Sequence, residues 1–197
     1  METEVVDIPS YIAGTWTIDP VHSSVGFVVR HLMISKVRGR FNTFDGEIVT
    51  AADPLQSGVT ATIQPASVDT GSAQRDAHIR STDFFDVDTH PTMTYRSTAI
   101  RRDGDRFIMD GELTLKGTTR SISLELEAHG FGPDPFIADP FAGARAGFTA
   151  TGEINRMDFG VSYNGPIPGG GMGLGESVQI ILEIQAILQP DAVPSTP

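Results

Sequence analysis

The chain has 197 residues, of which 39% are hydrophobic, and it carries a formal net charge of -11 with no cysteine. The acidic surplus argues against binding to nucleic acid or to anionic membrane surfaces, because phosphate groups are bound by Lys and Arg. The lack of cysteine excludes disulfides, zinc–thiolate sites and cysteine nucleophiles. No apolar run approaches about 18 residues, so no membrane span is expected.

This length suits one all-β domain, which we predict over residues 14–189, with a tail at each end. The N-terminal tail, residues 1–13, starts with acidic residues and lacks a basic region followed by an apolar run. No signal peptide is therefore expected, and the predicted location is cytoplasmic. The C-terminal tail, residues 190–197, is rich in proline.

Apolar and polar residues alternate through most of the domain, which is the pattern of half-buried β-strands. In chain order, this alternation and the intervening turn residues predict strands over residues 14–19, 22–31, 35–44, 46–51, 58–65, 92–101, 106–115, 119–128, 144–155 and 176–188.

The connections between these strands favour an antiparallel barrel. Asp103-Gly104-Asp105 and Lys116-Gly117 are hairpin turn sequences, and few connections are long enough for a crossover helix. Closing the strands into a barrel removes exposed edges, and a barrel of about eight strands can hold one small ligand. A barrel filled by its own side chains shows the same alternation, so the pattern leaves a hollow and a packed interior both open.

The segment from Asp69 to Tyr95 interrupts the strand pattern. Ser72 can cap a short helix, and the residues up to Arg80 allow about two turns of it. Phe84 and Phe85 follow in an acidic stretch, and two adjacent aromatic residues there need a core to enter. We expect them to form the floor or lid of whatever the strands enclose.

Residues for catalysis or metal binding form no recognised motif. None of the five histidines has a known metal-ligand spacing, and the chain lacks a nucleophile elbow, a Walker loop and a dinucleotide fingerprint. Asp76 and His78 are two residues apart, so on a helix they point to different faces and do not easily pair. We therefore predict no metal, no cofactor and no catalytic residue.

Two alternatives to a binding protein stay open. One is a hydrolase that acts through His78 or His22 with a nearby carboxylate, which requires a base within hydrogen-bond reach of the reacting group. The other is an interaction module with a fully packed core. Clustering of these side chains in a cleft would favour the enzyme, and a barrel without an internal void would favour the module.

A group of basic residues stands out against the acidic background: Arg30, Lys36, Arg38, Arg40, Arg75 and Arg80. They are either ordinary solvated charges or the rim of a basic mouth that meets an anionic head group while the barrel holds an apolar tail.

Ordered motifs run from Trp16 to about Ala186. They include Asp19-Pro-Val-His22-Ser-Ser-Val-Gly-Phe27, His31-Leu-Met-Ile-Ser-Lys-Val-Arg-Gly39-Arg-Phe41, Ser67-Val-Asp-Thr-Gly71, Arg75-Asp-Ala-His78-Ile-Arg-Ser81, Asp83-Phe-Phe-Asp86, Gly111-Glu-Leu-Thr-Leu-Lys-Gly117, Arg145-Ala-Gly-Phe148 and Ile154-Asn-Arg156-Met-Asp-Phe-Gly160. This set resembles the YceI-like family of lipocalin-like, polyisoprenoid-binding proteins. The resemblance implies an extended antiparallel β-barrel with a long apolar lumen that binds isoprenoid or other long-chain lipids without enzyme activity. It also implies a homodimer.

Strand alternation and this resemblance together select the candidate binding residues. The candidates for the lumen are Phe27, Phe41, Phe84, Phe85, Met93, Tyr95, Leu113, Leu115, Leu124, Leu126, Phe148 and Ile180. The candidates for contact with a head group are Arg38, Arg40, Arg75 and His78. The expected partner is a long-chain isoprenoid or fatty-acyl lipid.

Overall fold

A closed antiparallel β-barrel forms the body of the protein. The computed structural model describes residues 8, 10–137, 142–165, 167–171 and 173–190. Within them, the strands are β1 (Gly14–Ile18), β2 (Ser24–His31), β3 (Ser35–Phe41), β4 (Phe44–Thr50), β5 (Gly58–Ile63), β6 (Val68–Asp69), β7 (Met93–Asp103), β8 (Arg106–Leu115), β9 (Thr118–Gly132), β10 (Arg145–Asn155) and β11 (Leu174–Leu188).

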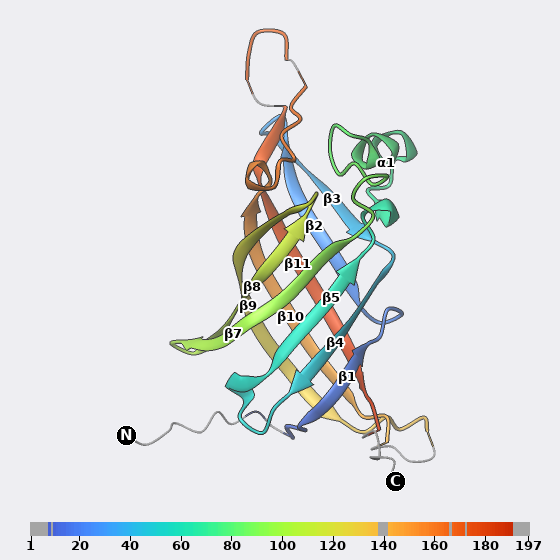
Figure 1. The fold of residues 1–197 in the computed structure, drawn as a ribbon, viewed down its shortest axis with the longest axis vertical. Helices are drawn as coiled ribbons and strands as arrows, with labels where there is room; N and C mark the ends of the chain where they lie inside the picture. The colour runs from blue at the N-terminus through green and yellow to red at the C-terminus, as the bar shows by residue number, and fades with distance from the viewer. Residues whose placement is uncertain (1–7, 9, 138–141, 166, 172, 191–197) are drawn as a thin grey trace.

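The barrel closes through the order β1-β4-β5-β7-β8-β9-β10-β11, with β11 returning to pair with β1. β11 is long enough to serve two partners on one edge. Its last residues pair with β1, and its first part pairs with β2, so β2, β3 and β6 extend the wall at the upper end of the molecule (Figure 1). The predicted antiparallel barrel with one short helix is confirmed.

The single α-helix of the described residues, α1 (Ala73–Arg80), lies beside this upper end (Figure 1). Ser72 caps it as predicted, because its hydroxyl oxygen accepts a hydrogen bond from the Arg75 amide. Asp76 is buried and accepts hydrogen bonds from the amide and hydroxyl of Thr70, which fixes the helix to the preceding turn. β6 and the three short 3-10 helices, Pro54–Gln56, Pro65–Ser67 and Arg156–Phe159, were not expected from the sequence.

Two glycines allow aromatic rings to lie flat on the inner wall. A Cβ atom at Gly39 would lie 2.2 Å from the ring of Phe27, and one at Gly111 would lie 2.3 Å from the hydroxyl of Tyr95. In both cases the ring covers a glycine on the neighbouring strand, where any side chain would displace it. The barrel wall is thus built to hold these rings inside the lumen.

A smaller apolar cluster closes the lower end. Trp16 is fully buried there, and its indole nitrogen donates to the Thr50 hydroxyl at 2.7 Å. Within the stretch 1–13, which sequence analysis assigns to a tail, Ile8, Tyr11 and Ile12 pack against this cluster. The Tyr11 hydroxyl also donates to the carbonyl of Ala51. Residues 1–7, 9 and 191–197 lie outside the described residues.

Candidate ligand-binding cavity

An apolar cavity of about 560 Å³ occupies the half of the barrel nearest α1. Its wall comes from β2, β3, β5, β7, β8, β9, β10 and β11, and its upper end is bordered by α1 and by the loop between the 3-10 helix Arg156–Phe159 and β11. Alternate residues of each strand face inward, so a sequence with period 2 produces a continuous apolar surface. The interior is therefore hollow, which strand alternation alone could not establish.

Ten of the twelve lumen candidates line this cavity: Phe27, Phe41, Phe84, Phe85, Met93, Tyr95, Leu113, Leu115, Leu124 and Ile180. The other two, Leu126 and Phe148, line a second apolar cavity of about 150 Å³ toward the lower end. Val25, Ile63, Tyr95 and Leu182 line both, so the two cavities meet at this ring of side chains. Val25, Ile63 and Leu182 were not among the lumen candidates, although they follow the same alternation.

Tyr95 brings a polar atom to the boundary between the two cavities. Its side chain is buried, and its hydroxyl has no hydrogen-bond partner within the part of the chain that the structure describes. Burial, with a smaller contribution from the charge of Asp110, raises the pKa of Tyr95 to about 12. The phenol is therefore neutral at physiological pH and is the one place in this ring where a ligand could receive a hydrogen bond.

Replacing Tyr95 by phenylalanine should leave the empty protein as stable as the wild type or stabilise it by up to about 1 kcal/mol, because the lost hydroxyl has no partner. The free energy of unfolding in urea measures this effect. The matched control is Tyr11→Phe, which removes a hydroxyl that donates to Ala51 and should cost about 1 kcal/mol. If Tyr95→Phe lowered the free energy of unfolding as much as Tyr11→Phe does, the Tyr95 hydroxyl would have a hydrogen-bond partner after all.

The upper rim of the cavity carries an aromatic and polar group. The rings of His78, Phe84 and Tyr163 pack against one another with centroid distances of 4.8 to 5.2 Å. His78 also forms a 2.7 Å contact with the Asp83 carboxylate. A ligand that entered past this rim would meet hydrogen-bonding side chains and the edges of aromatic rings before it reached the apolar wall.

The four head-group candidates divide into two pairs. Arg75 and His78 line the cavity, and the Arg75 guanidinium donates to the hydroxyl and carbonyl of Thr70. Arg38 and Arg40 line neither cavity and are exposed. They alternate with inward-facing residues of β3, so their side chains lie on its outer face.

Arg156 is a buried residue that sequence analysis named only within a family motif. It is 4% exposed, and its guanidinium donates hydrogen bonds to the carbonyl oxygens of Val161, Tyr163, Leu174 and Gly175. Burial lowers its pKa, against the opposing effect of Glu176. Because those carbonyls belong to both ends of the loop before β11, Arg156 holds that loop at the rim.

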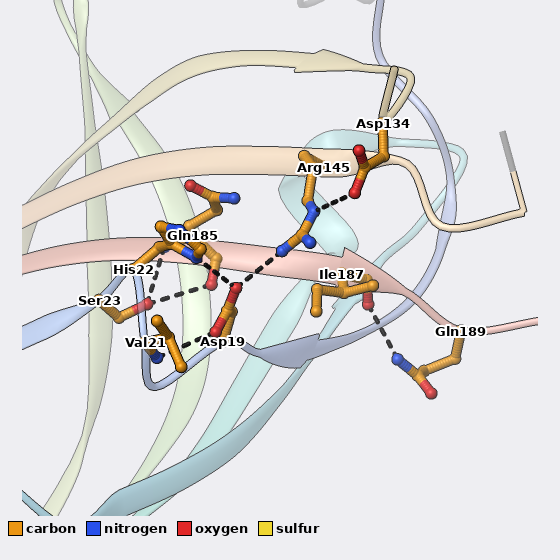
Figure 2. Close-up of polar contacts among 9 residues, drawn as sticks. All are labelled: Asp19, Val21, His22, Ser23, Asp134, Arg145, Gln185, Ile187 and Gln189. Atoms are coloured by element: carbon orange, nitrogen blue, oxygen red, sulfur yellow. Dashed lines mark hydrogen bonds and ion pairs between the residues drawn. The ribbon is translucent and has the colours of Figure 1, made fainter. Parts of the chain in front are cut away.

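A second polar group joins β1, β10 and the loop after β9, away from both cavities (Figure 2). Arg145 lies between two buried carboxylates, with 2.7 Å to Asp19 and 3.1 Å to Asp134. Asp19 also accepts hydrogen bonds from the Val21 amide and from His22. The arrangement ties three chain segments together, and Asp19, Asp134 and Arg145 line neither of the two cavities.

This polar group should make the protein sensitive to acid. Burial alone would raise the pKa of Asp19, but hydrogen bonds from His22, the Val21 amide and Arg145 outweigh it and hold the pKa below its ordinary value. The Phe136 amide and Arg145 also lower the pKa of Asp134, against the effect of burial. A carboxyl of this kind stabilises the fold above its unfolded pKa of about 3.9, and the contribution is lost as the pH falls through the lower folded value.

We therefore expect the free energy of unfolding, measured by urea titration, to fall as the pH drops from about 5 to about 2. Arg145→Met should be less stable at neutral pH and should show a smaller fall, because its carboxylates have lost their shared partner. Arg106→Met, which removes an exposed pair with Glu125, is the control and should behave like the wild type. Equal acid sensitivity in Arg145→Met and the wild type would contradict this role.

The described residues hold three histidine–carboxylate pairs that bear on the hydrolase alternative: His22 with Asp19, His78 with Asp83, and His129 with Glu127. In the described residues, the imidazoles of His22 and His78 make no hydrogen bond to a hydroxyl that could act as a nucleophile. The imidazole of His129 contacts the Thr149 hydroxyl at 2.6 Å, but neither residue lines a cavity that could hold a substrate. His78 pairs with Asp83 and not with Asp76, which agrees with the spacing argument. The same residues contain no group of three or more His, Asp or Glu that could hold a metal ion.

A hollow antiparallel barrel with an apolar lumen defines a protein of the lipocalin-like binding type. The chain belongs to the YceI-like family, because the model of the YceI-like domain matches residues 16–186. It is 35% identical over 184 residues to protein YceI of Escherichia coli O157:H7, covering 91% of this chain and 90% of that protein. None of the described helices has the length and apolar character that crossing a bilayer requires.

Two solved structures are similar in fold. BcnA of Burkholderia cenocepacia has a TM-score of 0.70 at 24% identity, over 85% of this chain and 98% of that one. A domain from Saccharophagus degradans, described as polyisoprenoid-binding and implicated in plant cell wall breakdown, has a TM-score of 0.64 at 16% identity. The alignment with that domain covers 90% of this chain and 99% of the domain.

Proposed function

We propose that this protein binds one long-chain apolar lipid, a polyisoprenoid in the first instance, and stores or transports it without chemical change. The observation that carries the proposal is the apolar cavity of about 560 Å³ inside the barrel. A similar fold in a domain described as polyisoprenoid-binding supports the choice of lipid. Binding by burial needs no catalytic group, in keeping with a lumen wall that is almost wholly apolar.

The energetics favour a long ligand over a short one. Transfer of each methylene from water to the lumen contributes about 0.8 kcal/mol before association costs, so a chain of about ten buried carbons can offset those costs. The second cavity extends the apolar surface beyond Tyr95. A tail longer than the first cavity could continue past Val25, Ile63, Tyr95 and Leu182 into the second.

The polar end of the ligand is expected at the rim near α1. Arg75 and His78 line the cavity there, and Tyr163 and Asn164 add a phenol and an amide. An anionic or hydroxyl head group could accept hydrogen bonds from these side chains while its tail points toward Tyr95. Arg38 and Arg40 are not part of this proposal, because they lie on the outer face of the barrel wall.

A series of prenols of increasing length tests the function. Geraniol, farnesol and geranylgeraniol should compete with a fluorescent fatty-acyl probe with affinities that rise with length, by up to roughly fourfold per buried methylene. The rise should end once the tail fills the two cavities. Absence of competition by every prenol, or equal affinity for all of them, would overturn the proposal and favour a module whose cavity is not a binding site.

The cytoplasmic location and the homodimer remain predictions that follow from the N-terminal sequence and the family resemblance. Fractionation of the native host and sedimentation of the purified protein test them separately. Neither outcome alters the expected contents of the cavity.

A further inference from the structure

The turn between β2 and β3 exposes three consecutive apolar side chains. Leu32, Met33 and Ile34 are 45%, 49% and 84% exposed. Single exposed apolar residues are common, but three adjacent ones at the tip of a hairpin form a projecting apolar surface. We call these three residues the hairpin tip.

The backbone of the hairpin tip is strained. Leu32 and Met33 have φ angles of 50° and 57°, in the left-handed region that asparagine and glycine adopt at hairpin turns. Bulky apolar residues are costly in this conformation, and water gives them no compensating contact. The turn is therefore less stable with Leu32 and Met33 than it would be with glycine or asparagine, and the turn itself does not require apolar side chains.

The only lysine and arginine side chains without a partner in the described residues flank this tip. The chain has 14 lysines and arginines, all of them within the described ranges. Arg30, Lys36 and Arg38 make no hydrogen bond or ion pair there, whereas the other eleven contact carboxylates, carbonyls, hydroxyls or an aromatic ring.

These three charges lie close together on the outer face of the hairpin. Arg30 is directly opposite Lys36 in the strand register, and Arg38 is opposite Val28. Like charges at facing positions repel one another, so the arrangement is unfavourable unless something anionic binds to it. Arg40, farther from the tip, already contacts Asp69 at 3.4 Å.

The hairpin tip also stands at the rim of the large cavity. His31 and Leu32 line that cavity, and the Leu32 amide donates to the carbonyl of Gly173 in the loop before β11. Figure 1 shows the ends of β2 and β3 near this loop at the top of the barrel. If the hairpin tip entered an apolar surface, that surface would therefore lie next to the rim of the large cavity.

We propose that the β2–β3 hairpin docks the protein on a lipid bilayer that contains anionic lipids. Leu32, Met33 and Ile34 enter the boundary between head groups and acyl chains, and Arg30, Lys36 and Arg38 bind lipid phosphates. The net charge of -11 predicts repulsion from such a surface. Salt screens charges beyond about 10 Å at 0.1 M, so the local group of basic residues decides the contact.

Docking concerns the outer hairpin, whereas the proposed function concerns the lumen, so each can fail without the other. If both hold, the contact places the cavity rim at the source of the lipid, and the ligand can pass between bilayer and barrel with little exposure to water. The surface fits a bilayer better than a protein partner, because the tip is small and projecting and the flanking charges are all of one sign.

Flotation with phosphatidylglycerol–phosphatidylcholine vesicles tests the proposal. Wild-type protein should bind these vesicles, bind pure phosphatidylcholine vesicles much more weakly, and be released by high salt. Ile34→Asp, and Lys36→Glu combined with Arg38→Glu, should each lower binding by about tenfold or more. The matched controls are Val21→Asp, at a residue 81% exposed in the β1–β2 connection, and Arg96→Glu on β7; both should bind like the wild type.

A further variant separates docking from a structural role of the tip. Met33→Gly removes an apolar side chain and also relieves the left-handed strain, so it should melt at the same or a higher temperature yet bind vesicles more weakly. Uptake of geranylgeraniol in solution should be unchanged in all hairpin variants. Failure of the wild type to float with anionic vesicles, or unchanged binding in Ile34→Asp, would overturn docking. A dimer in solution that Ile34→Asp dissociates would also overturn it, because the tip would then be a contact between copies.

Discussion

Replacing Ile180 by tryptophan should reduce the affinity for a long-chain lipid by about 100-fold or more, the largest effect on binding that we expect from one substitution. Ile180 lies on β11, lines the large cavity and faces Phe27 on β2. An indole at this position takes up the space that the lipid tail would occupy. The lost burial of only a few methylenes, at about 0.8 kcal/mol each, accounts for an effect of this size.

The neighbouring residue supplies a matched control for this substitution. Ile181 is the same type of residue on the same strand, but it lines neither cavity, because successive side chains of a strand point to opposite faces. Ile181→Trp should bind geranylgeraniol with the affinity of the wild type. Binding isotherms of both folded variants, checked by circular dichroism, provide the comparison. If both variants bind equally well, the lipid does not lie in the lumen.

Replacing Arg156 by methionine should destabilise the protein by about 3 kcal/mol or more, the largest effect on stability that we expect. The methionine would fill part of the volume but would remove the guanidinium donor from four carbonyl oxygens, of which that of Leu174 keeps a 3.4 Å hydrogen bond from the Asn164 amide. These carbonyls include Tyr163, whose ring packs against His78 at the rim. The loop before β11 should therefore loosen, and the rim should lose its shape along with the stability.

Urea unfolding measures the stability, and Arg96→Met is the appropriate comparison. Arg96 also forms a 2.7 Å contact, with Glu112, but its side chain is 62% exposed, so its loss should cost no more than about 1 kcal/mol. A similar small loss in Arg156→Met would mean that the buried hydrogen bonds are replaced by water. Proteolysis within the loop should also become faster in Arg156→Met, because its anchoring contacts are gone.

The fold was predictable because local patterns and the overall architecture agree. Alternation along the strands, glycine turns such as Lys116-Gly117, and the cap at Ser72 each specify a local structure that the barrel retains. β6 was not predictable, because two residues carry no periodicity of their own. Their pairing with Arg40 and Phe41 depends on where the following helix lies.

The site was predictable only in part, for a physical reason. An inward-facing side chain has the same sequence signature whether it touches another side chain or an empty lumen. Alternation therefore predicts that Leu124 and Ile180 face inward, but it does not predict the cavity. Alternation already implied that Arg38 and Arg40 lie on the outer face of β3, because Gly39 and Phe41 on the same strand face inward. Arg156 had no such signal, because its partners are carbonyls that the sequence does not distinguish.

Mass spectrometry of organic extracts from natively purified protein tests the central claim most directly. We expect a stoichiometric long-chain lipid, an isoprenoid by proposal, in extracts of the wild type and of Ile181→Trp. The same lipid should be missing from folded Ile180→Trp. Wild-type protein that is empty, and that also takes up no isoprenoid or fatty-acyl probe, would contradict the account.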